Sequence, residues 1–195
     1  PASGGLPMLV MQAVRAHELF FGRKVEPQTA AHVLQTIADE RADYVLIGMP
    51  GCGKTTVGTL LAEQSGRRFF DLDAEIAARS GRTAAEWIRT RGEDAFRAYE
   101  SEVCASLAAE SGAVIACGGG TVTRPENMRR LCRNGTVICL TRPLDALATA
   151  DRPLSADGVA HLYKARRPLY EAYADLTVEN DGDPAQTARE ILARV

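Results

Sequence analysis

The chain has 195 residues, enough for one domain of ordinary size and a remainder, since domains average roughly 150 residues. Its 46% of hydrophobic and 25% of charged residues exclude a disordered or fibrous chain. Its net charge of −2 excludes a global attraction to nucleic acid or to an anionic membrane, so we expect neither partner. An anionic ligand must therefore be bound by a local site.

The first part of the chain predicts two helices and no strand. The first helix is expected from Leu6 to Phe21, where apolar residues recur at helical spacing, and a turn follows from Gly22 to Pro27. The second helix is expected from Thr29 to Arg41. We therefore expect residues 1–42 to form a helical extension and residues 43–195 to form a separate domain.

From Asp43 onward, short β-branched runs alternate with amphipathic segments. The expected strands are Tyr44–Gly48, Arg67–Asp71, Ala113–Cys117, Thr136–Leu140 and Asp175–Glu179. The expected helices are Lys54–Gln64, Leu72–Arg79, a longer pair within Thr83–Glu110, Pro125–Cys132, Asp145–Ala150, Ala160–Tyr173 and Pro184–Arg194. This alternation predicts an α/β fold with one five-stranded parallel sheet and helices on both of its faces.

A glycine-rich segment between the first expected strand and its helix matches G-x-x-x-x-G-K-[ST]. It runs from Gly48 to Thr55 as GMPGCGKT. Such a loop turns successive backbone N–H groups toward phosphate oxygens, and the helix that follows adds a partial positive charge. Lys54 would reach the β- and γ-phosphates, and the Thr55 hydroxyl would bind Mg²⁺. The alternative is a chance glycine turn, but the flanking strand and helix favour nucleotide binding.

Two carboxylates, Asp71 and Asp73, follow the second expected strand. Alternation along an extended segment would send both to one side, one toward a metal and one toward an acceptor hydroxyl. The alternative is an acidic cap on the next helix, where aspartate is favoured in any case. The residues alone leave both interpretations open.

A run of glycines and several arginines are further candidates for the acceptor site. Gly118, Gly119 and Gly120 close the third expected strand and would let a ligand approach the backbone, although a plain tight turn needs the same residues. Arginines at 97, 152 and 166 would each be a solvated surface residue if considered alone. Together they suit a small anionic substrate beside a nucleotide.

The order of these motifs, GMPGCGKTTVG, FFDLD, FR, GGGTV, DRPLS and RRPLY, resembles shikimate kinase from Val45 to Val195. The resemblance implies a P-loop fold of the nucleoside-monophosphate-kinase-like type. It also implies transfer of the ATP γ-phosphoryl group to the 3-hydroxyl of shikimate, on the pathway to chorismate and the aromatic amino acids.

The resemblance further implies a role for each matching residue. Lys54, Asp73 and Arg152 would be catalytic, with Asp73 as the base and Arg152 as the lid arginine. Thr55 and Asp71 would act on Mg²⁺. The implied shikimate-binding residues are Asp73, Arg97, Gly118, Gly119, Gly120 and Arg166. The implied ATP-binding residues are Gly48, Pro50, Gly51, Cys52, Gly53, Lys54, Thr55, Thr56 and Arg152.

Two segments depart from the plain kinase pattern. The expected lid around residues 148–164 is short, and Leu147–Ala150 lacks a further arginine near the nucleotide base. Residues 4–22 resemble the C-terminal helix of shikimate dehydrogenase, including Gln12, the glutamine that touches shikimate in that family. We therefore expect the chain to be the kinase part of a bifunctional polypeptide. The alternative is a native helical extension that packs on the kinase or mediates dimerisation.

Two other functions stay open at this point: a kinase for another small hydroxy acid such as gluconate, and a silent nucleotide-binding scaffold. Arg97 and Arg166 with Asp73 favour a cyclic hydroxy acid, and the intact phosphate loop disfavours a scaffold. The five cysteines include no C-x-x-C pair, which predicts reduced thiols and a cytoplasmic protein. Three scattered histidines predict no metal cluster.

Overall fold

The computed structural model describes residues 5–147 and 156–195. Two compact units divide the chain, Pro1–Ala42 and Asp43–Val195. None of the described helices is both long enough and apolar enough to span a membrane.

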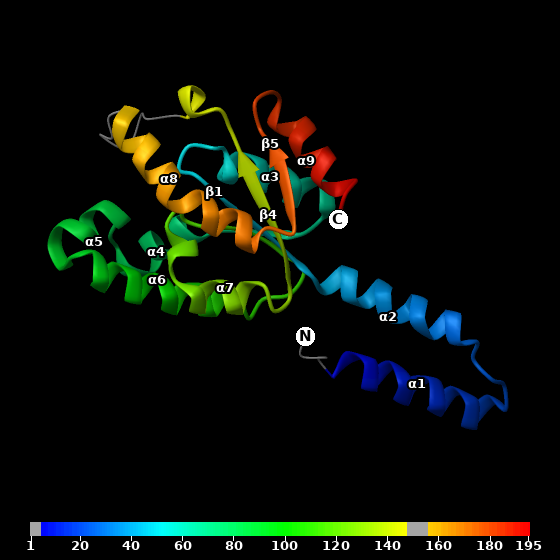
Figure 1. Ribbon diagram of the computed structural model, residues 1–195. Helices are drawn as coiled ribbons and strands as arrows, with labels where there is room; N and C mark the ends of the chain where they lie inside the picture. The colour runs from blue at the N-terminus through cyan, green and yellow to red at the C-terminus, as the bar shows by residue number, and fades with distance from the viewer. Residues whose placement is uncertain (1–4, 148–155) are drawn as a thin grey trace. The chain divides into compact units, whose positions relative to one another are not determined.

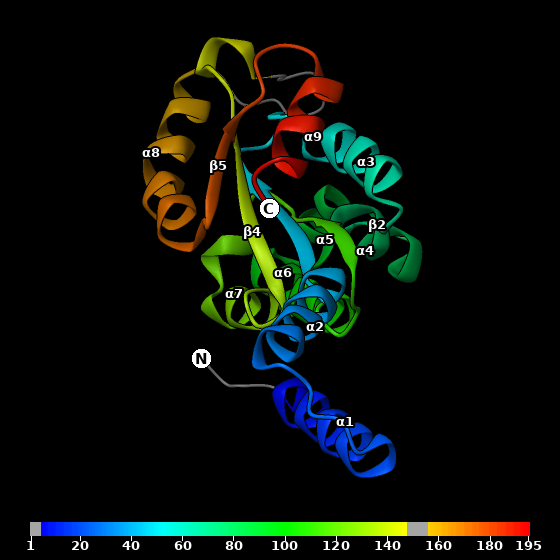
Figure 2. The same ribbon diagram turned by 90° about the vertical axis from the view of Figure 1, so that its right-hand side faces the viewer.

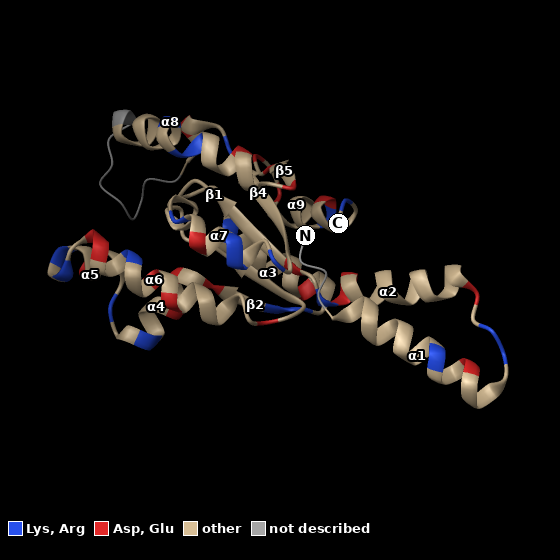
Figure 3. Cartoon of the chain, turned by 60° about the horizontal axis from the view of Figure 1, so that its bottom comes forward, with Lys and Arg blue, Asp and Glu red and all other residues tan. Residues whose placement is uncertain are grey.

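The N-terminal unit is a pair of helices, α1 (Leu6–Phe21) and α2 (Pro27–Arg41). Gly22 ends α1 in the left-handed conformation, and Pro27 starts α2 two residues before the expected position because proline suits the first turn of a helix. Apolar side chains of both helices line a cavity of about 470 Å³. Charged residues are sparse along α1 (Figure 3), and Phe20 is 85% exposed although the sequence places it on the apolar face.

The second unit contains one sheet of five parallel strands (Figure 1). The strands are β1 (Asp43–Gly48), β2 (Arg68–Asp71), β3 (Ala113–Ala116), β4 (Gly135–Thr141) and β5 (Leu176–Glu179). Their order is β2-β3-β1-β4-β5. The predicted α/β class and parallel sheet are confirmed, and each strand begins and ends within one residue of its expected position.

Helices cover both faces of this sheet, as expected. They are α3 (Lys54–Ser65), α4 (Leu72–Ser80), α5 (Ala84–Arg91), α6 (Glu93–Leu107), α7 (Pro125–Leu131), α8 (Ala156–Tyr173) and α9 (Pro184–Leu192). Figure 2 shows α3 and α9 on one face and α8 on the other. Because both faces are covered, β1 and β3 carry continuous apolar runs, and Leu46, Ile47 and Ile115 are fully buried.

The predicted helix from Asp145 to Ala150 is wrong over its described part. A 3₁₀ turn, η2 (Leu144–Ala146), is followed by Leu147 with an extended backbone. The side chain of Leu147 is buried in the core, and its backbone is extended where the helix was expected to continue. Residues 148–150 lie outside the described residues.

Candidate active site

The phosphate loop connects β1 to α3, at the carboxyl edge of the sheet. Parallel α/β sheets bind their ligands at this edge, where neighbouring crossovers run in opposite directions. Here β1 lies between β3 and β4, so its carboxyl end opens such a crevice. Gly53 has a φ of 94°, a left-handed conformation that a side chain would strain. Thr55 and Thr56 follow in the exposed first turn of α3.

The Lys54 side chain is folded back into the loop that precedes it. Its ammonium group donates to the carbonyl oxygen of Gly48 at 3.0 Å and to that of Met49 at 2.9 Å. Lys54 is 9% exposed, so these carbonyls replace water around a buried charge. In this structure, therefore, the lysine is bound to the loop itself.

Thr55 and Asp71 form a pair of oxygen groups beside the loop. The Thr55 hydroxyl donates to Asp71 Oδ2 at 2.6 Å. Asp71 Oδ1 accepts from the backbone N–H of Ala74 at 3.1 Å, which caps α4. The cap interpretation of Asp71 is thus confirmed, and its bond to Thr55 also puts it beside the expected metal ligand; Asp73 lies on α4, so the expected alternation along an extended segment does not orient it. Hydroxyl and carboxylate oxygens are the donors that Mg²⁺ prefers, and it needs few protein ligands because it keeps several waters.

The other described candidates line a cavity of about 980 Å³. Its lining includes Asp73 of α4, Arg97 of α6, Arg166 of α8 and the glycine run Gly118–Gly120. Residues of α5, Ile88 and Arg89 among them, also line this cavity. The sequence analysis therefore predicted Asp73, Arg97, Arg166 and the glycine run, but neither Glu100 nor the contribution of α5.

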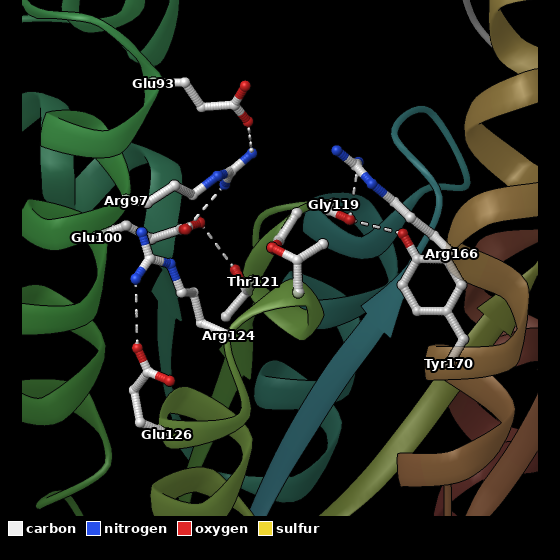
Figure 4. Close-up of polar contacts among 11 residues, drawn as sticks. Glu93, Arg97, Glu100, Gly119, Thr121, Arg124, Glu126, Arg166 and Tyr170 are labelled. Carbon is white, nitrogen blue, oxygen red and sulfur yellow. Dashed lines mark hydrogen bonds and ion pairs between the residues drawn. The ribbon is translucent and has the colours of Figure 1, made fainter.

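Arg97 is held in place by two glutamates of its own helix (Figure 4). Its guanidinium donates to Glu100 at 2.8 Å and to Glu93 at 3.2 Å. Glu100 is fully buried and also accepts from the Thr121 hydroxyl at 3.0 Å. Burial alone would lower the pKa of Arg97, but the two glutamates outweigh it and raise the pKa above its usual value. Arg97 therefore enters the cavity as a fixed, permanent cation.

Arg166 and Tyr170 approach the glycine run from α8 (Figure 4). Both donate to the carbonyl oxygen of Gly119, Arg166 at 3.0 Å and Tyr170 at 2.7 Å. Burial raises the pKa of the Tyr170 hydroxyl well above its usual value, so the phenol keeps the proton that it donates. The Gly119 carbonyl thus fixes the position of the Arg166 guanidinium, which comes from the distant helix α8.

The glycine run is a place of close approach rather than a plain turn. A side chain at Gly120 would collide with the guanidinium group of Arg97. At Gly118 a Cβ would lie 2.9 Å from the Asp73 carboxylate, and at Gly119 it would lie 2.7 Å from the ring of Pro50. The glycines therefore bring the cavity, its charged groups and the phosphate loop into contact.

Four residues of the site escaped the sequence analysis: Glu100, Thr121, Tyr170 and Asn180. Glu100 lies three residues after Arg97, a spacing that places two side chains on the same side of a helix and could have revealed it. Thr121 and Asn180 gave no comparable signal. Arg152 and most of the expected lid lie in residues 148–155, outside the described residues.

Comparisons with known proteins identify the family of the chain. The family model described as shikimate kinase matches residues 50–195. Shikimate kinase of Clostridium beijerinckii is 38% identical over 154 residues, which cover 75% of this chain and 90% of that protein. The relative from Persephonella marina is 36% identical over 159 residues, and the alignment covers 96% of that protein. The structure of shikimate kinase from Acinetobacter baumannii in complex with shikimate superposes with a TM-score of 0.76 at 35% identity. The superposition covers 92% of that chain and 79% of this one. The chain therefore belongs to the shikimate kinase family.

Proposed function

We propose that the protein transfers the γ-phosphoryl group of ATP to the 3-hydroxyl of shikimate and releases shikimate 3-phosphate and ADP. The observation that carries this proposal is the close approach of Pro50 to Gly119, where an added Cβ would lie 2.7 Å from the proline ring, so that the acceptor cavity lies beside the phosphate loop. Phosphoryl transfer needs the attacking oxygen and the leaving oxygen on opposite sides of the phosphorus, in adjoining sites. A single crevice at the edge of the sheet supplies both.

The acceptor is bound and activated by three charged side chains. Arg97 and Arg166 hold the shikimate carboxylate, because guanidinium groups suit bidentate binding of a planar anion. Asp73 accepts the proton of the 3-hydroxyl while the hydroxyl oxygen forms a bond to the γ-phosphorus. The bond from the γ-phosphorus to the bridging oxygen breaks, and ADP leaves with that electron pair.

The nucleotide is bound by the loop that precedes α3. Lys54 moves from the carbonyls of Gly48 and Met49 to the phosphates, where its charge offsets the charge that develops during transfer. Thr55, with Asp71 behind it, holds Mg²⁺. The ion, when bound, neutralises negative charge on the phosphate oxygens. Arg152 is proposed to assist Lys54 at the same oxygens.

The alternatives left open by the sequence are less well supported. A kinase for gluconate is disfavoured because the family model and the similar curated proteins are those of shikimate kinase. A silent scaffold would not need Lys54, Thr55 and Asp73 in place around one crevice.

A coupled assay of ADP release separates the three functions. With ATP and Mg²⁺, we expect turnover with shikimate that far exceeds turnover with gluconate or without an acceptor. Turnover with gluconate would favour the alternative kinase. Nucleotide binding without turnover on any acceptor would favour the scaffold. Omission of Mg²⁺ from the shikimate reaction tests the metal, and full activity without a divalent cation would remove it from the proposal.

We also propose that residues 1–42 carry the last helix of a shikimate dehydrogenase fused to the kinase. The resemblance of residues 4–22 to the C-terminal helix of shikimate dehydrogenase supports this origin, against the alternative of a native helical extension that packs on the kinase or mediates dimerisation. The upstream reading frame tests the fusion, and a stop codon directly before an initiator methionine would refute it. A cytoplasmic location is part of the same proposal and is supported by five unpaired cysteines.

A further inference from the structure

Asn180 is a buried polar residue at the end of β5 that the proposed reaction does not use. Its backbone N–H donates to the carbonyl of Thr141 at 2.8 Å, which continues the pairing of β5 with β4. The residue is only 4% exposed. A buried amide must find hydrogen-bond partners, and those of Asn180 lie in the phosphate loop and in α9.

The Asn180 side chain bridges these two elements. Its Nδ2 donates to the carbonyl oxygen of Cys52 at 2.8 Å, and its Oδ1 accepts from the Thr187 hydroxyl at 3.0 Å. A carbonyl can only accept, so Cys52 requires the NH₂ end of the amide. Thr187 is 5% exposed and supplies the donor that the other end requires. The two contacts together define one orientation of the amide.

This orientation bears on how the loop meets a phosphate. A phosphate-binding loop turns its N–H groups toward the ligand, so its carbonyl oxygens must point away. When such an oxygen is buried, it needs a donor from the protein. The ammonium group of Lys54 serves the carbonyls of Gly48 and Met49, and Asn180 serves that of Cys52.

The planarity of the peptide bond carries this effect to the next amide. In a trans peptide the C=O and the N–H that follows point in opposite directions. A carbonyl of Cys52 that is fixed toward Asn180 therefore fixes the N–H of Gly53 on the side away from Asn180. A side chain at Gly53 would collide with the Asn180 amide, so the two groups are in direct contact.

We infer that Asn180, oriented by Thr187, is a positioning residue for the nucleotide. It sets the Cys52–Gly53 peptide so that the Gly53 amide faces the β- and γ-phosphates before ATP arrives. This inference rests on the proposed function in that it takes the loop to bind ATP. It adds that a residue from the far end of the chain determines how well the loop does so.

Binding of ADP to the full-length protein, measured by calorimetry, tests the inference without any acceptor. We expect Asn180→Ala to weaken ADP binding about tenfold, because the Cys52 carbonyl loses its donor. Asn180→Asp keeps the shape but opposes a carboxylate to that carbonyl, and we expect at least the same loss. Thr187→Val removes only the hydroxyl, and we expect a loss of about threefold.

Asn134→Ala is the matched control. Asn134 also donates its side-chain amide to a buried acceptor, Asp43 Oδ2 at 3.4 Å, but at the start of β1, the opposite end of that strand from the loop. We expect it to lower the melting temperature and to leave ADP binding unchanged. In steady state, the Asn180 variants should raise the KM for ATP about tenfold and the KM for shikimate less than twofold.

The inference is overturned if both Asn180 variants and Thr187→Val bind ADP within twofold of the unchanged protein, whatever their melting temperatures. It is also overturned if Asn134→Ala weakens ADP binding as much as they do. Should one Asn180 variant fail to fold, the other and Thr187→Val still decide the question. If the unchanged protein binds ADP but does not phosphorylate shikimate, the proposed function fails while the role of Asn180 is still measured.

Discussion

The partners of Lys54 in the phosphate loop lie within six residues of its own position, whereas the charged groups of the acceptor cavity come from α4, α5, α6 and α8. The loop is one continuous segment, and a loop of this kind binds phosphate largely through its backbone N–H groups. The cavity depends on side chains that come together only when the sheet and its helices have formed. The nucleotide site is thus built mainly from one local segment with a distant support at Asn180, whereas every charged group of the acceptor site depends on the tertiary fold.

The two regions also differ in what binding must change. The ammonium group of Lys54 donates to two carbonyls of the loop, and these hydrogen bonds must break before it can reach a phosphate. Arg97 already has its carboxylate partners and its orientation, and Arg166 is already bound to Gly119. The acceptor cavity is preorganised, which reduces the entropy lost when a substrate is bound. Substitutions in the acceptor cavity should therefore change turnover and shikimate binding while they leave nucleotide binding unchanged.

Asp73→Asn should have the largest effect and should leave the two regions distinct. The amide cannot take the proton of the acceptor hydroxyl, so we expect kcat to fall on the order of 10³-fold. ADP binding by calorimetry should stay within twofold, because Asp73 lines the acceptor cavity. Near-normal turnover would remove Asp73 from the role of base. A parallel loss of ADP binding would show that the two regions are not separable.

Glu100→Gln should test whether the cavity depends on a buried ion pair. Glu100 is fully buried between Arg97 and Thr121, and loss of its charge leaves Arg97 without its closest partner. We expect the free energy of unfolding to fall by about 3 kcal/mol. We expect the KM for shikimate to rise about tenfold and the KM for ATP to change little.

Glu93→Gln is the control for that substitution, since Glu93 contacts the same arginine but is 64% exposed. An exposed ion pair contributes little, so we expect nearly unchanged stability and KM values. Equal effects from the two variants would mean that proximity to Arg97, and not burial of the charge, controls the cavity.

Arg166→Lys should have a smaller effect, confined to the acceptor side. A lysine cannot hold the Gly119 carbonyl and a carboxylate with one planar fork, so we expect the KM for shikimate to rise about five- to tenfold. The neighbouring Arg167→Lys is the control, because Arg167 is exposed and pairs with Glu171 at 2.6 Å. Similar KM values for both variants would contradict a specific role for Arg166.

The same contrast explains what could be predicted from the sequence. The phosphate loop is a contiguous pattern between a strand and a helix, so Lys54 and Thr55 were assigned from spacing alone. Arg97 and Arg166 were assigned through the resemblance to a family, because nothing local distinguishes them from surface arginines. Their placement in one cavity agrees with that assignment.

The residues that support these groups could not be predicted in the same way. Tyr170 and Asn180 act on backbone carbonyls that are 51 and 128 residues away in the sequence. No pattern in one sequence reports a contact over such a separation. The expected helix after Pro143 failed for a related reason, since burial of Leu147 in the core overrode the local helical pattern.

Tyr170→Phe should give the smallest effect and sharpen the comparison most finely. Only the hydroxyl is lost, and Arg166 still donates to the Gly119 carbonyl, so this oxygen keeps one of its two donors. We expect the free energy of unfolding to fall by about 1 kcal/mol, measured by urea denaturation. The KM for shikimate should rise about twofold, because the glycine run is held less firmly against the cavity. The KM for ATP should change less, because the hydroxyl reaches the phosphate loop only by a weak contact to Met49 Sδ at 4.0 Å, whereas its bond to the Gly119 carbonyl is 2.7 Å long. A larger change in the KM for ATP than in the KM for shikimate would mean that Tyr170 acts through the phosphate loop. The loop and the acceptor cavity would then depend on the same supporting residue.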